Sequence, residues 1–530
     1  MKLKDLIQDI GAVEIRGSVD TAITAVTSDS RAVVPGALFI AVRGFASDGH
    51  AYISQALQKG AVAVICEEIP GQAGNDGSKE GTAEALSSAS LRDQTGSPEI
   101  SDFWGVSIRA NAPERASAVP ETTFVKVENS RHAVAMVADA FYGHPSRKLT
   151  LVGITGTNGK TTTVTLLYKL FRSMGHPCGL LSTIANYVDG RRLETANTTA
   201  DPITINRLLA EMVDAGCSYC FMEVSSIGVE QERVAGLQFA AGIFSNLTHD
   251  HLDYHKTFAE YLRCKKLFFD NLPRTACAII NTDDKNGPVM VQNTAAKVVT
   301  YACRRPADHT ARILEQSFEG MLLRIDGKET WSRLVGAHNA YNLLAIYTTA
   351  VCLGCREDEV LVALSDLRSA PGRLETVRGP RDLAVVIDYA HTPDALENVL
   401  TTLRNVAPER QLICLFGCGG DRDKTKRPEM GQVAARLADR LVVTSDNCRT
   451  EDPEAILADI KAGLDRDGLA KSLFVTDRRE AIRTAILTAP EGATILLAGK
   501  GHEDYQIIGH EKLHFDEKEI VAETFKLILP

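Results

Sequence analysis

The sequence lacks the features that would point to a membrane or to nucleic acid. No apolar run approaches the length of a membrane span, and the first residues mix both charge signs instead of forming a basic and apolar targeting signal. An excess of positive charge is also absent, because 58 Lys and Arg residues stand against 68 Asp and Glu, a formal net charge of −10. We therefore expect a cytoplasmic protein that inserts into no membrane and binds no nucleic acid.

A clustered set of metal-binding cysteines is lacking as well. The 12 cysteines are scattered along the chain and mostly lie in apolar surroundings, which suits reduced thiols in a protein core. Two pairs have the spacing C-x-x-C, Cys217 with Cys220 and Cys352 with Cys355. Because the pairs are far apart and no polar loops surround them, we interpret them as core residues and not as a zinc site.

The composition is that of an ordinary globular protein, with 44% hydrophobic and 24% charged residues. A length of 530 residues favours about three or four domains. In the first part, the strand-like stretches 37–42, 61–65 and 123–127 alternate with helix-like ones, as in an α/β unit. Residues from about 70 to 119 are rich in Gly, Ser, Ala and acidic residues, so we expect an inserted, largely disordered loop there.

The most informative stretch is GITGTNGKTTT at 153–163. An apolar, β-branched run precedes it and a stretch of helical composition follows, which predicts a glycine loop between a strand and a helix. Such a loop directs backbone N–H groups at an anion. Lys160 would reach the terminal phosphates of a nucleotide, and the Thr161 hydroxyl would hold Mg²⁺. The strict motif has glycine where Ile154 stands, so Gly156 opens a shorter loop; the alternative is an ordinary Gly/Thr turn.

Four predicted strands in the last part of the chain each run directly into a polar loop. The strands are 383–387, 412–416, 441–444 and 494–498, and the loops are 388–393, 417–423, 445–451 and 499–505. In an open parallel sheet, ligands bind beyond the carboxyl ends of the strands. We therefore expect these loops to form one binding crevice, although four unrelated surface turns would have the same pattern.

Residues 248–255, THDHLDYH, gather three histidines and two aspartates. The segment resembles the zinc motif H-x-H-x-D-H of metallo-β-lactamase-like hydrolases, except that Tyr254 delays the final histidine by one place. This alternative, a zinc hydrolase, leaves the phosphate loop without a role.

Two further residues could carry chemistry. Lys265 falls on the apolar stripe of the predicted helix 258–269, whereas Lys266 points elsewhere. A lysine on a buried face must pair, lose its proton or be modified, but one at the edge of the stripe can reach solvent, and the pattern leaves both readings open. Glu223 sits among strand-forming residues and is either a Mg²⁺ ligand at a strand end or a solvent-facing glutamate.

Together these segments resemble the Mur ligase family, and most closely its members that add the third residue of the peptidoglycan stem peptide. The resemblance runs from residue 29 to the C-terminus, apart from 70–119. The shared motifs occur in order: DSR (29–31), TGTNGKTT (155–162), NTT (197–199), MEVSS (222–226), DHLDYH (250–255), PGRLE (371–375), DYAHTPDAL (388–396), FGCGGDRDKTKRP (416–428) and AGKGHEDYQ (498–506).

The resemblance implies an α/β fold with three domains: a UDP-sugar-binding domain at 1–147, a central P-loop mononucleotide-binding domain at 148–372 and a Rossmann-like C-terminal domain for the amino acid at 373–530. The implied activity is ATP-dependent addition of meso-diaminopimelate to UDP-N-acetylmuramoyl-L-alanyl-D-glutamate through an acyl phosphate, with L-lysine as the alternative amino acid. A ligase like folylpolyglutamate synthase would share the ATP core but would not need the DSR domain. A monomer that uses Mg²⁺ and a CO₂-derived carbamate on Lys265 is also implied.

The resemblance assigns roles to individual residues. Those implied to bind ATP are Gly156, Thr157, Asn158, Gly159, Lys160, Thr161, Thr162, Asn339, Asn342 and Asp388. Those implied to bind the UDP-muramoyl dipeptide are Ser30, Phe45, Ala46, Ser47, Thr198, Thr199, Ser225, Gln231 and Arg233. Those implied to bind diaminopimelate are Arg422, Asp446, Asn447, Cys448, Arg449, Gly499 and Glu503. The implied metal ligands are Thr161, Glu223, His251 and carbamylated Lys265, and the implied catalytic residues are Lys160, Lys265, His251, Glu223 and Arg373.

The loop 446–449 resembles the loop that selects diaminopimelate over lysine. Diaminopimelate carries a second carboxylate, and the Arg449 guanidinium can pair with it through two hydrogen bonds. The chain departs from the family pattern at Cys448, where proline is usual, at Ile227, where histidine is usual, and at His338, where an aromatic residue is usual.

Overall fold

A computed structural model of the protein describes residues 1–44, 47–70, 122–248, 252–369 and 371–528. The described chain forms two compact units, Met1–Ala133 and Val134–Pro530. The insert predicted at about 70–119 lies outside the described residues apart from its first residue. No helix within the described ranges is long and apolar enough to cross a membrane.

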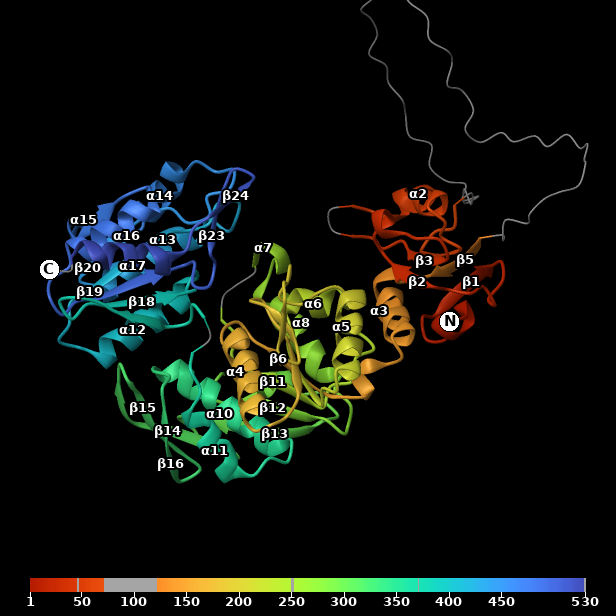
Figure 1. The fold of residues 1–530 in the computed structure, drawn as a ribbon, viewed down its shortest axis with the longest axis horizontal. Helices are drawn as coiled ribbons and strands as arrows, with labels where there is room; N and C mark the ends of the chain where they lie inside the picture. The colour runs from red at the N-terminus through yellow and green to blue at the C-terminus, as the bar shows by residue number, and fades with distance from the viewer. Residues whose placement is uncertain (45–46, 71–121, 249–251, 370, 529–530) are drawn as a thin grey trace, which may run out of the picture. The chain divides into compact units, whose positions relative to one another are not determined.

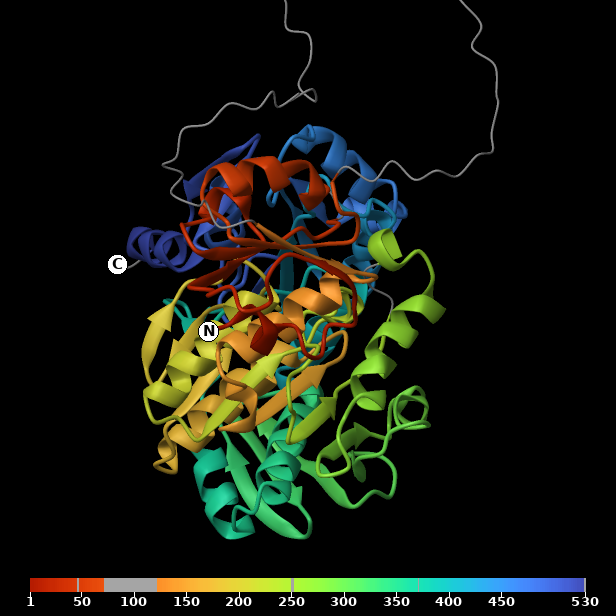
Figure 2. The ribbon, with the colours of Figure 1, turned by 90° about the vertical axis from the view of Figure 1, so that its right-hand side faces the viewer.

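The described residues of the first unit form a five-stranded sheet in the order β1-β5-β4-β3-β2, in which only β1 is antiparallel to its neighbour. Figure 2 looks onto this unit, and α2 packs on one face of its sheet. The strands predicted at 37–42, 61–65 and 123–127 are β3, β4 and β5. The elements are α1 (Leu3–Leu6), β1 (Ala12–Arg16), β2 (Ala25–Thr27), η1 (Ser30–Ala32), β3 (Ala37–Ile40), η2 (Gly49–Tyr52), α2 (Ile53–Gln58), β4 (Ala63–Cys66), β5 (Thr123–Val127) and α3 (Ser130–Phe141), which runs across the boundary between the units.

The second unit begins with an 11-stranded sheet, as far as the described residues show it, in the order β16-β15-β14-β13-β12-β11-β6-β10-β7-β8-β9. The elements are η3 (Pro145–Arg147), β6 (Thr150–Thr155), α4 (Lys160–Ser173), β7 (Cys178–Leu181), β8 (Asn186–Val188), β9 (Arg191–Leu193), α5 (Pro202–Asp214), β10 (Tyr219–Glu223), α6 (Ser226–Glu230), β11 (Ala241–Phe244), α7 (Leu252–His255), α8 (Phe258–Asp270), β12 (Cys277–Asn281), α9 (Gly287–Met290), β13 (Lys297–Ala302), β14 (His309–Ser317), β15 (Gly320–Ile325), β16 (Lys328–Ser332), α10 (Ala337–Cys352) and α11 (Glu357–Ser365).

Strand β6 lies inside this sheet, parallel to β10 on one side and β11 on the other. Both faces of the sheet are covered, which is why β6 reads as a continuous apolar run. Helices α4, α10 and α11 pack on one face, and α5 and α8 pack on the other (Figure 1). The phosphate loop therefore begins at the end of a rigid strand, at the carboxyl edge of a sheet that is buried on both faces.

The last part of the second unit is a sheet with the order β17-β18-β22-β19-β20-β21, six strands among those described. All neighbours are parallel except β17 and β18. The strands predicted at 412–416 and 494–498 have the observed bounds of β19 and β22. The elements are β17 (Glu375–Arg378), β18 (Ala384–Asp388), α12 (Pro393–Val406), β19 (Leu412–Phe416), α13 (Lys426–Leu437), β20 (Arg440–Val443), α14 (Pro453–Lys461), α15 (Arg466–Ala470), β21 (Ser472–Phe474), α16 (Arg478–Leu487), β22 (Thr494–Ala498), β23 (Tyr505–Ile508), β24 (Glu511–His514) and α17 (Glu517–Leu527).

Candidate functional site

The phosphate loop connects β6 to α4 and needs glycine at two positions. Gly156 and Gly159 have φ angles of +151° and +87°, in the region that L-residues avoid. A Cβ atom on Gly156 would lie 2.0 Å from Ser245 Oγ, and one on Gly159 would lie 2.6 Å from Asn342 Oδ1. The loop conformation and its close packing therefore both exclude larger residues.

The side chains of the loop lie at the start of helix α4. The Lys160 ammonium donates hydrogen bonds to the carbonyl oxygens of Gly156 and Thr157, both at 2.9 Å. Thr161 and Thr162 occupy the first turn of the helix and are nearly buried. The predicted glycine loop between a strand and a helix is observed, and a lysine and hydroxyls beside a helix N-terminus are suited to hold an anion.

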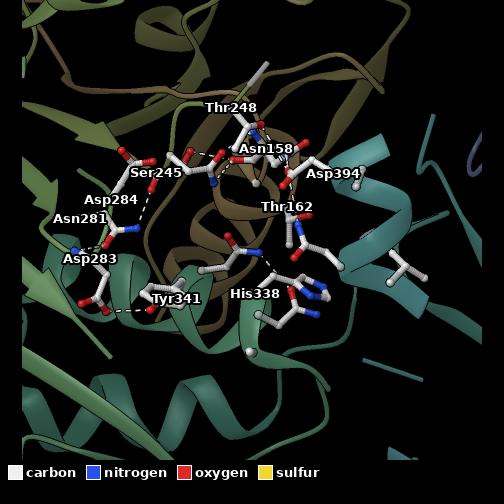
Figure 3. A pocket seen from close by; sticks show the side chains of 18 of the residues that line it. Asn158, Thr162, Ser245, Thr248, Asn281, Asp283, Asp284, His338, Tyr341 and Asp394 are labelled. Carbon is white, nitrogen blue, oxygen red and sulfur yellow. Dashed lines mark hydrogen bonds between the residues drawn. The ribbon is translucent and has the colours of Figure 1, made fainter. Parts of the chain in front are cut away.

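A cavity of about 400 Å³ opens beside this loop (Figure 3). The predicted ATP-binding residues Asn339, Asn342 and Asp388 line it, together with Asn158, Gly159, Thr162 and Arg373. Asn342 Nδ2 donates to Asn339 Oδ1 at 3.1 Å, and Asn339 Nδ2 donates to the carbonyl oxygen of Val335 at 2.9 Å. These contacts fix both amides of helix α10 at the cavity wall.

The same cavity has a second polar wall that the sequence analysis missed. Asn281 ends strand β12 and Asp283 and Asp284 follow it; the Tyr341 hydroxyl donates a hydrogen bond to Asp283 Oδ2 at 2.7 Å (Figure 3). The signal was present in the sequence, because a polar run directly after a buried strand is the pattern that identified the C-terminal loops.

Arg373 and burial together shift the pKa values of titratable groups near this cavity. Burial raises the pKa of Asp388, although Arg373 and two backbone N–H groups act against the rise. Burial and the Arg373 charge lower the pKa of His338 to about 4, and the same two causes lower that of His502 to about 4. Both imidazoles are therefore neutral near pH 7, so Arg373, and not either histidine, offers a positive charge to an anionic ligand at this part of the cavity wall.

Glu223 ends strand β10 with one carboxylate oxygen occupied. Oε1 accepts hydrogen bonds from the Thr183 backbone N–H at 2.8 Å and from the Thr183 hydroxyl at 3.0 Å. Within the described residues, Oε2 is buried and has no hydrogen-bond partner, and the whole residue is only 1% exposed. A buried carboxylate oxygen without a donor fits a cation ligand better than a solvent-facing glutamate.

Lys265 occupies the buried side of helix α8. It is 1% exposed, and its Nζ donates to the Gly156 carbonyl oxygen at 2.9 Å and lies 4.6 Å from the ring centroid of Tyr261. Lys266 instead pairs with Asp270 at 2.6 Å. Of the two readings that the sequence left open, the buried one is observed, beside the phosphate loop.

Another cavity, of about 230 Å³, is lined by both Lys160 and Lys265. The predicted substrate residues Thr198, Thr199, Ser225 and Arg233 line it. Arg233 also donates to the carbonyl oxygen of Thr199 at 2.6 Å and to Gln231 Oε1 at 2.7 Å, which brings Gln231 to the same cluster although it does not line the cavity.

Not every predicted site residue can be related to these cavities. Ser30 and Ser47 belong to the first unit, where Ser30 Oγ donates to Gln55 Oε1 at 2.7 Å. Phe45, Ala46 and His251 lie outside the described residues.

The four C-terminal loops line one cavity of about 390 Å³, together with the phosphate loop and Glu223. This is the convergence expected from the parallel strand ends. The lining residues that were predicted to bind the amino acid are Arg422, Asp446, Asn447, Arg449, Gly499 and Glu503. Cys448 is 4% exposed and belongs to the core of the domain, so its side chain packs behind the cavity wall. The Arg449 guanidinium donates to the Gly420 carbonyl oxygen at 2.8 Å.

These cavities are suited to hold an anion, a cation and a polar ligand close together, and the comparisons with known proteins give the class of protein: an ATP-dependent ligase that forms an amide bond. The chain belongs to the Mur ligase family. It matches the family's catalytic domain over residues 22–142, the Mur ligase middle domain over 154–350 and the glutamate ligase domain over 372–501. The predicted family and α/β fold class are therefore confirmed.

Two full-length relatives and one solved structure have the same name. The UDP-N-acetylmuramoyl-L-alanyl-D-glutamate--2,6-diaminopimelate ligase of Bacteroides fragilis is 47% identical over 528 residues, covering 99% of this chain and 100% of that protein. The ligase of the same name from Parabacteroides distasonis is 48% identical over 526 residues, covering 99% of each. A solved structure with this name is 29% identical, has a TM-score of 0.65 and covers 99% of both chains.

A more distant solved structure has a similar fold but a different name. The folylpolyglutamate synthase of Mycobacterium tuberculosis, solved with ADP and AMPPCP, has a TM-score of 0.57 at 19% identity and covers 70% of this chain. At this identity the likeness shows the fold alone. The zinc-hydrolase alternative is not favoured, because the curated relatives reported above are ligases.

Proposed function

We propose that this enzyme adds meso-diaminopimelate to the D-glutamate residue of UDP-N-acetylmuramoyl-L-alanyl-D-glutamate. One observation supports it most strongly: a single cavity contains the phosphate loop, Glu223 and the four loops of the C-terminal sheet. A carboxylate activated by ATP and an incoming amine would meet there. The names of the relatives indicate both substrates.

The proposed reaction has two steps. The γ-phosphoryl group of ATP passes to the γ-carboxylate of D-glutamate, which gives an acyl phosphate and ADP. The free amine of diaminopimelate then attacks the acyl carbon, and the tetrahedral intermediate releases inorganic phosphate as the amide forms. Lys160 and Arg373 neutralise charge on the transferring phosphoryl group, and holding both reactants in one cavity supplies the positional part of the catalysis.

The residues also fit Mg²⁺. Glu223 Oε2, buried without a donor among the described residues, and the Thr161 hydroxyl are oxygen ligands of the kind that Mg²⁺ prefers. His251 and a carbamate on Lys265 would complete the set. Magnesium bound there would offset the negative charge of the phosphates. The carbamate would replace a buried ammonium with a second anionic oxygen donor near the phosphate loop.

The remaining assignments are part of the same proposal. Thr198, Thr199, Ser225, Gln231 and Arg233 contact the muramoyl peptide, and Ser30, Phe45, Ala46 and Ser47 contact the uridine nucleotide. Three domains at 1–147, 148–372 and 373–530 divide the binding of UDP-sugar, ATP and amino acid. The enzyme works in the cytoplasm as a monomer on small-molecule substrates.

The choice between diaminopimelate and lysine depends on Arg449. It lines the cavity beside Asp446 and Glu503, so the site offers both a cation and carboxylates. Diaminopimelate carries an ammonium and a carboxylate at its far end, whereas lysine carries only an ammonium. The cation therefore favours diaminopimelate.

The decisive experiment measures ADP release by the purified protein. ADP should form when ATP, the UDP-muramoyl dipeptide and meso-diaminopimelate are all present, with a tripeptide product of the expected mass. Omitting the dipeptide should abolish the release. If ADP forms at the same rate without any amino acid and no tripeptide accumulates, the protein is a nucleotide hydrolase and the proposal is wrong.

A further inference from the structure

Lys500 is a fully buried lysine behind the wall of the amino-acid cavity. It lies between Gly499 and Gly501, whose φ angles are +118° and +55°. A Cβ atom on Gly501 would lie 2.7 Å from Tyr389 Cβ, and one on Gly499 would lie 2.9 Å from Asp446 Oδ2. This turn therefore needs glycine on both sides, and it directs the Lys500 side chain inward, where it is 0% exposed.

The Lys500 ammonium contacts three polar side chains that line the cavity. Its Nζ lies 3.3 Å from Asp446 Oδ1, 3.0 Å from Asn447 Oδ1 and 3.4 Å from Glu503 Oε2. Two carboxylates therefore share this one cation, and the cluster has an excess of negative charge on its cavity side. Two buried carboxylates that share one ammonium retain the capacity to bind the ammonium group of a ligand.

Asn447 is held in one orientation by Lys500. Its Oδ1 accepts from Lys500 and also from the backbone N–H of Ile507 at 2.9 Å. Its Nδ2 consequently faces Glu503 and donates to Oε2 at 2.9 Å. Without the ammonium, one donor to Oδ1 is lost and the two carboxylates repel each other, so the amide and the Glu503 carboxylate would no longer be fixed.

The two carboxyl groups differ in their charge balance. Burial raises the pKa of Asp446, but the charges of Lys500 and Arg478 outweigh burial and leave that pKa below its ordinary value. At Glu503 burial prevails over Lys500, and the pKa is raised. Arg478 has its own buried partner, Glu517, at 2.8 Å. Lys500 is therefore the cation in direct contact with both carboxylates.

We infer that Lys500 is a positioning residue that orients Asn447 and Glu503 for the ammonium group of the incoming amino acid. The inference rests on the proposed function, because it needs an amino-acid substrate in this cavity. The inference also goes beyond the proposed function, since Lys500 is buried and acts through residues that the substrate would touch. Lys500 also offsets part of the negative charge of the two carboxylates that would face this ammonium group.

The test compares Lys500→Met with wild type in two assays. The first is the KM for diaminopimelate and for ATP in the complete reaction. The second traps the acyl phosphate with hydroxylamine when no amino acid is present, which reports the first half-reaction alone. Arg410→Met is the matched control, because Arg410 is a nearly buried cation of the same domain that pairs with Asp382.

We expect Lys500→Met to raise the KM for diaminopimelate about ten- to a hundred-fold, the effect of losing charged hydrogen bonds, with little change in the KM for ATP or in trapping. Arg410→Met should change none of these values. An unchanged KM for diaminopimelate, or an equal rise for both substrates, would overturn the inference. A wild-type protein that gives no hydroxamate would instead refute the proposed function.

Lys500→Met leaves two buried carboxylates without their shared cation and can fail to fold. A second pair of variants removes this difficulty: Asp446→Asn, and Asp446→Asn combined with Lys500→Met, in which the excess charge is smaller. The added Lys500→Met substitution should still raise the KM for diaminopimelate over that of Asp446→Asn. If the two variants have the same KM, Lys500 does not position the site.

Discussion

The Lys265 ammonium donates a hydrogen bond to the Gly156 carbonyl oxygen, 2.9 Å away, and so joins helix α8 to the loop that would hold the ATP phosphates. A cation at this depth would have to face Mg²⁺ once the metal is bound, and like charges repel. Reaction of the neutral amine with CO₂ forms a carbamate and releases a proton, which turns the cation into an oxygen donor. The buried position of Lys265 therefore favours a carbamate over an ammonium group when Mg²⁺ is bound.

We predict that Lys265→Ala is inactive and that a small added carboxylate, such as formate or acetate, partly restores turnover, because the anion can occupy the place of the missing carbamate. In wild type, ¹³C-bicarbonate should give a carbamate signal that is absent from the variant. Lys266→Ala is the matched control, since Lys266 is paired with Asp270. A fully active enzyme with an unmodified Lys265 amine, nucleotide and metal bound, would contradict the prediction.

A second prediction concerns Lys160. Lys160→Ala should fold normally but lose most turnover, on the order of 10²- to 10³-fold in kcat, because the lysine cancels charge that builds on the transferring phosphoryl group. Lys169→Ala, further along the same helix, removes a lysine whose Nζ donates to the carbonyl oxygens of Arg368 and Ser369, and it should retain activity. Steady-state ADP release measures the activity of both variants, and thermal unfolding checks that each variant is folded. Wild-type ligation by folded Lys160→Ala would remove the basis for the phosphate-loop assignment.

Acidification should destabilise the protein through His338. Burial and Arg373 lower its pKa from 6.5 to about 4, so between about pH 6.5 and about pH 4 the unfolded chain binds a proton that the folded chain does not. The free energy of unfolding therefore falls as the pH falls through this range, and the histidine contributes no pH dependence above it.

The His338→Phe variant removes that titration. Its melting temperature should fall less steeply than that of wild type between about pH 6.5 and about pH 4, measured without ligands. His510→Asn, at an exposed position, is the control and should follow the wild-type curve. Parallel curves for wild type and His338→Phe would show that His338 is not kept neutral by the fold.

Much of the scaffold could be predicted because strand ends are local signals. Strands β19 and β22 are apolar runs that stop at glycine-rich loops, and parallel strands necessarily bring those loops to one edge. The burial of Lys265 could not be decided from the sequence, because a residue at the edge of the apolar face of a helix and one at its centre have the same spacing pattern. Lys500 was missed for a different reason: its partner Asp446 is 54 positions away in the chain, and only the fold brings the two together.

The last prediction concerns the choice of amino acid. Arg449 lies in left-handed conformation with φ +50°, and its backbone bridges to Ile508, so the loop is held against β23. The packing of Cys448, 4% exposed, adds to this support in place of the usual proline. With the guanidinium at the cavity, lysine would leave it without the carboxylate that diaminopimelate provides.

Wild type should therefore prefer meso-diaminopimelate over L-lysine, and Arg449→Ala should lose about 1.5–3 kcal/mol of that preference, roughly ten- to a hundred-fold. The measurement is kcat/KM for both amino acids. Arg449→Lys keeps the positive charge but loses the planar guanidinium that pairs with a carboxylate through two hydrogen bonds, so its selectivity should fall between that of wild type and that of Arg449→Ala. Cys448→Pro should sharpen the preference or leave it unchanged. Equal use of both amino acids by wild type, or full selectivity in Arg449→Ala, would mean that another residue recognises the second carboxylate.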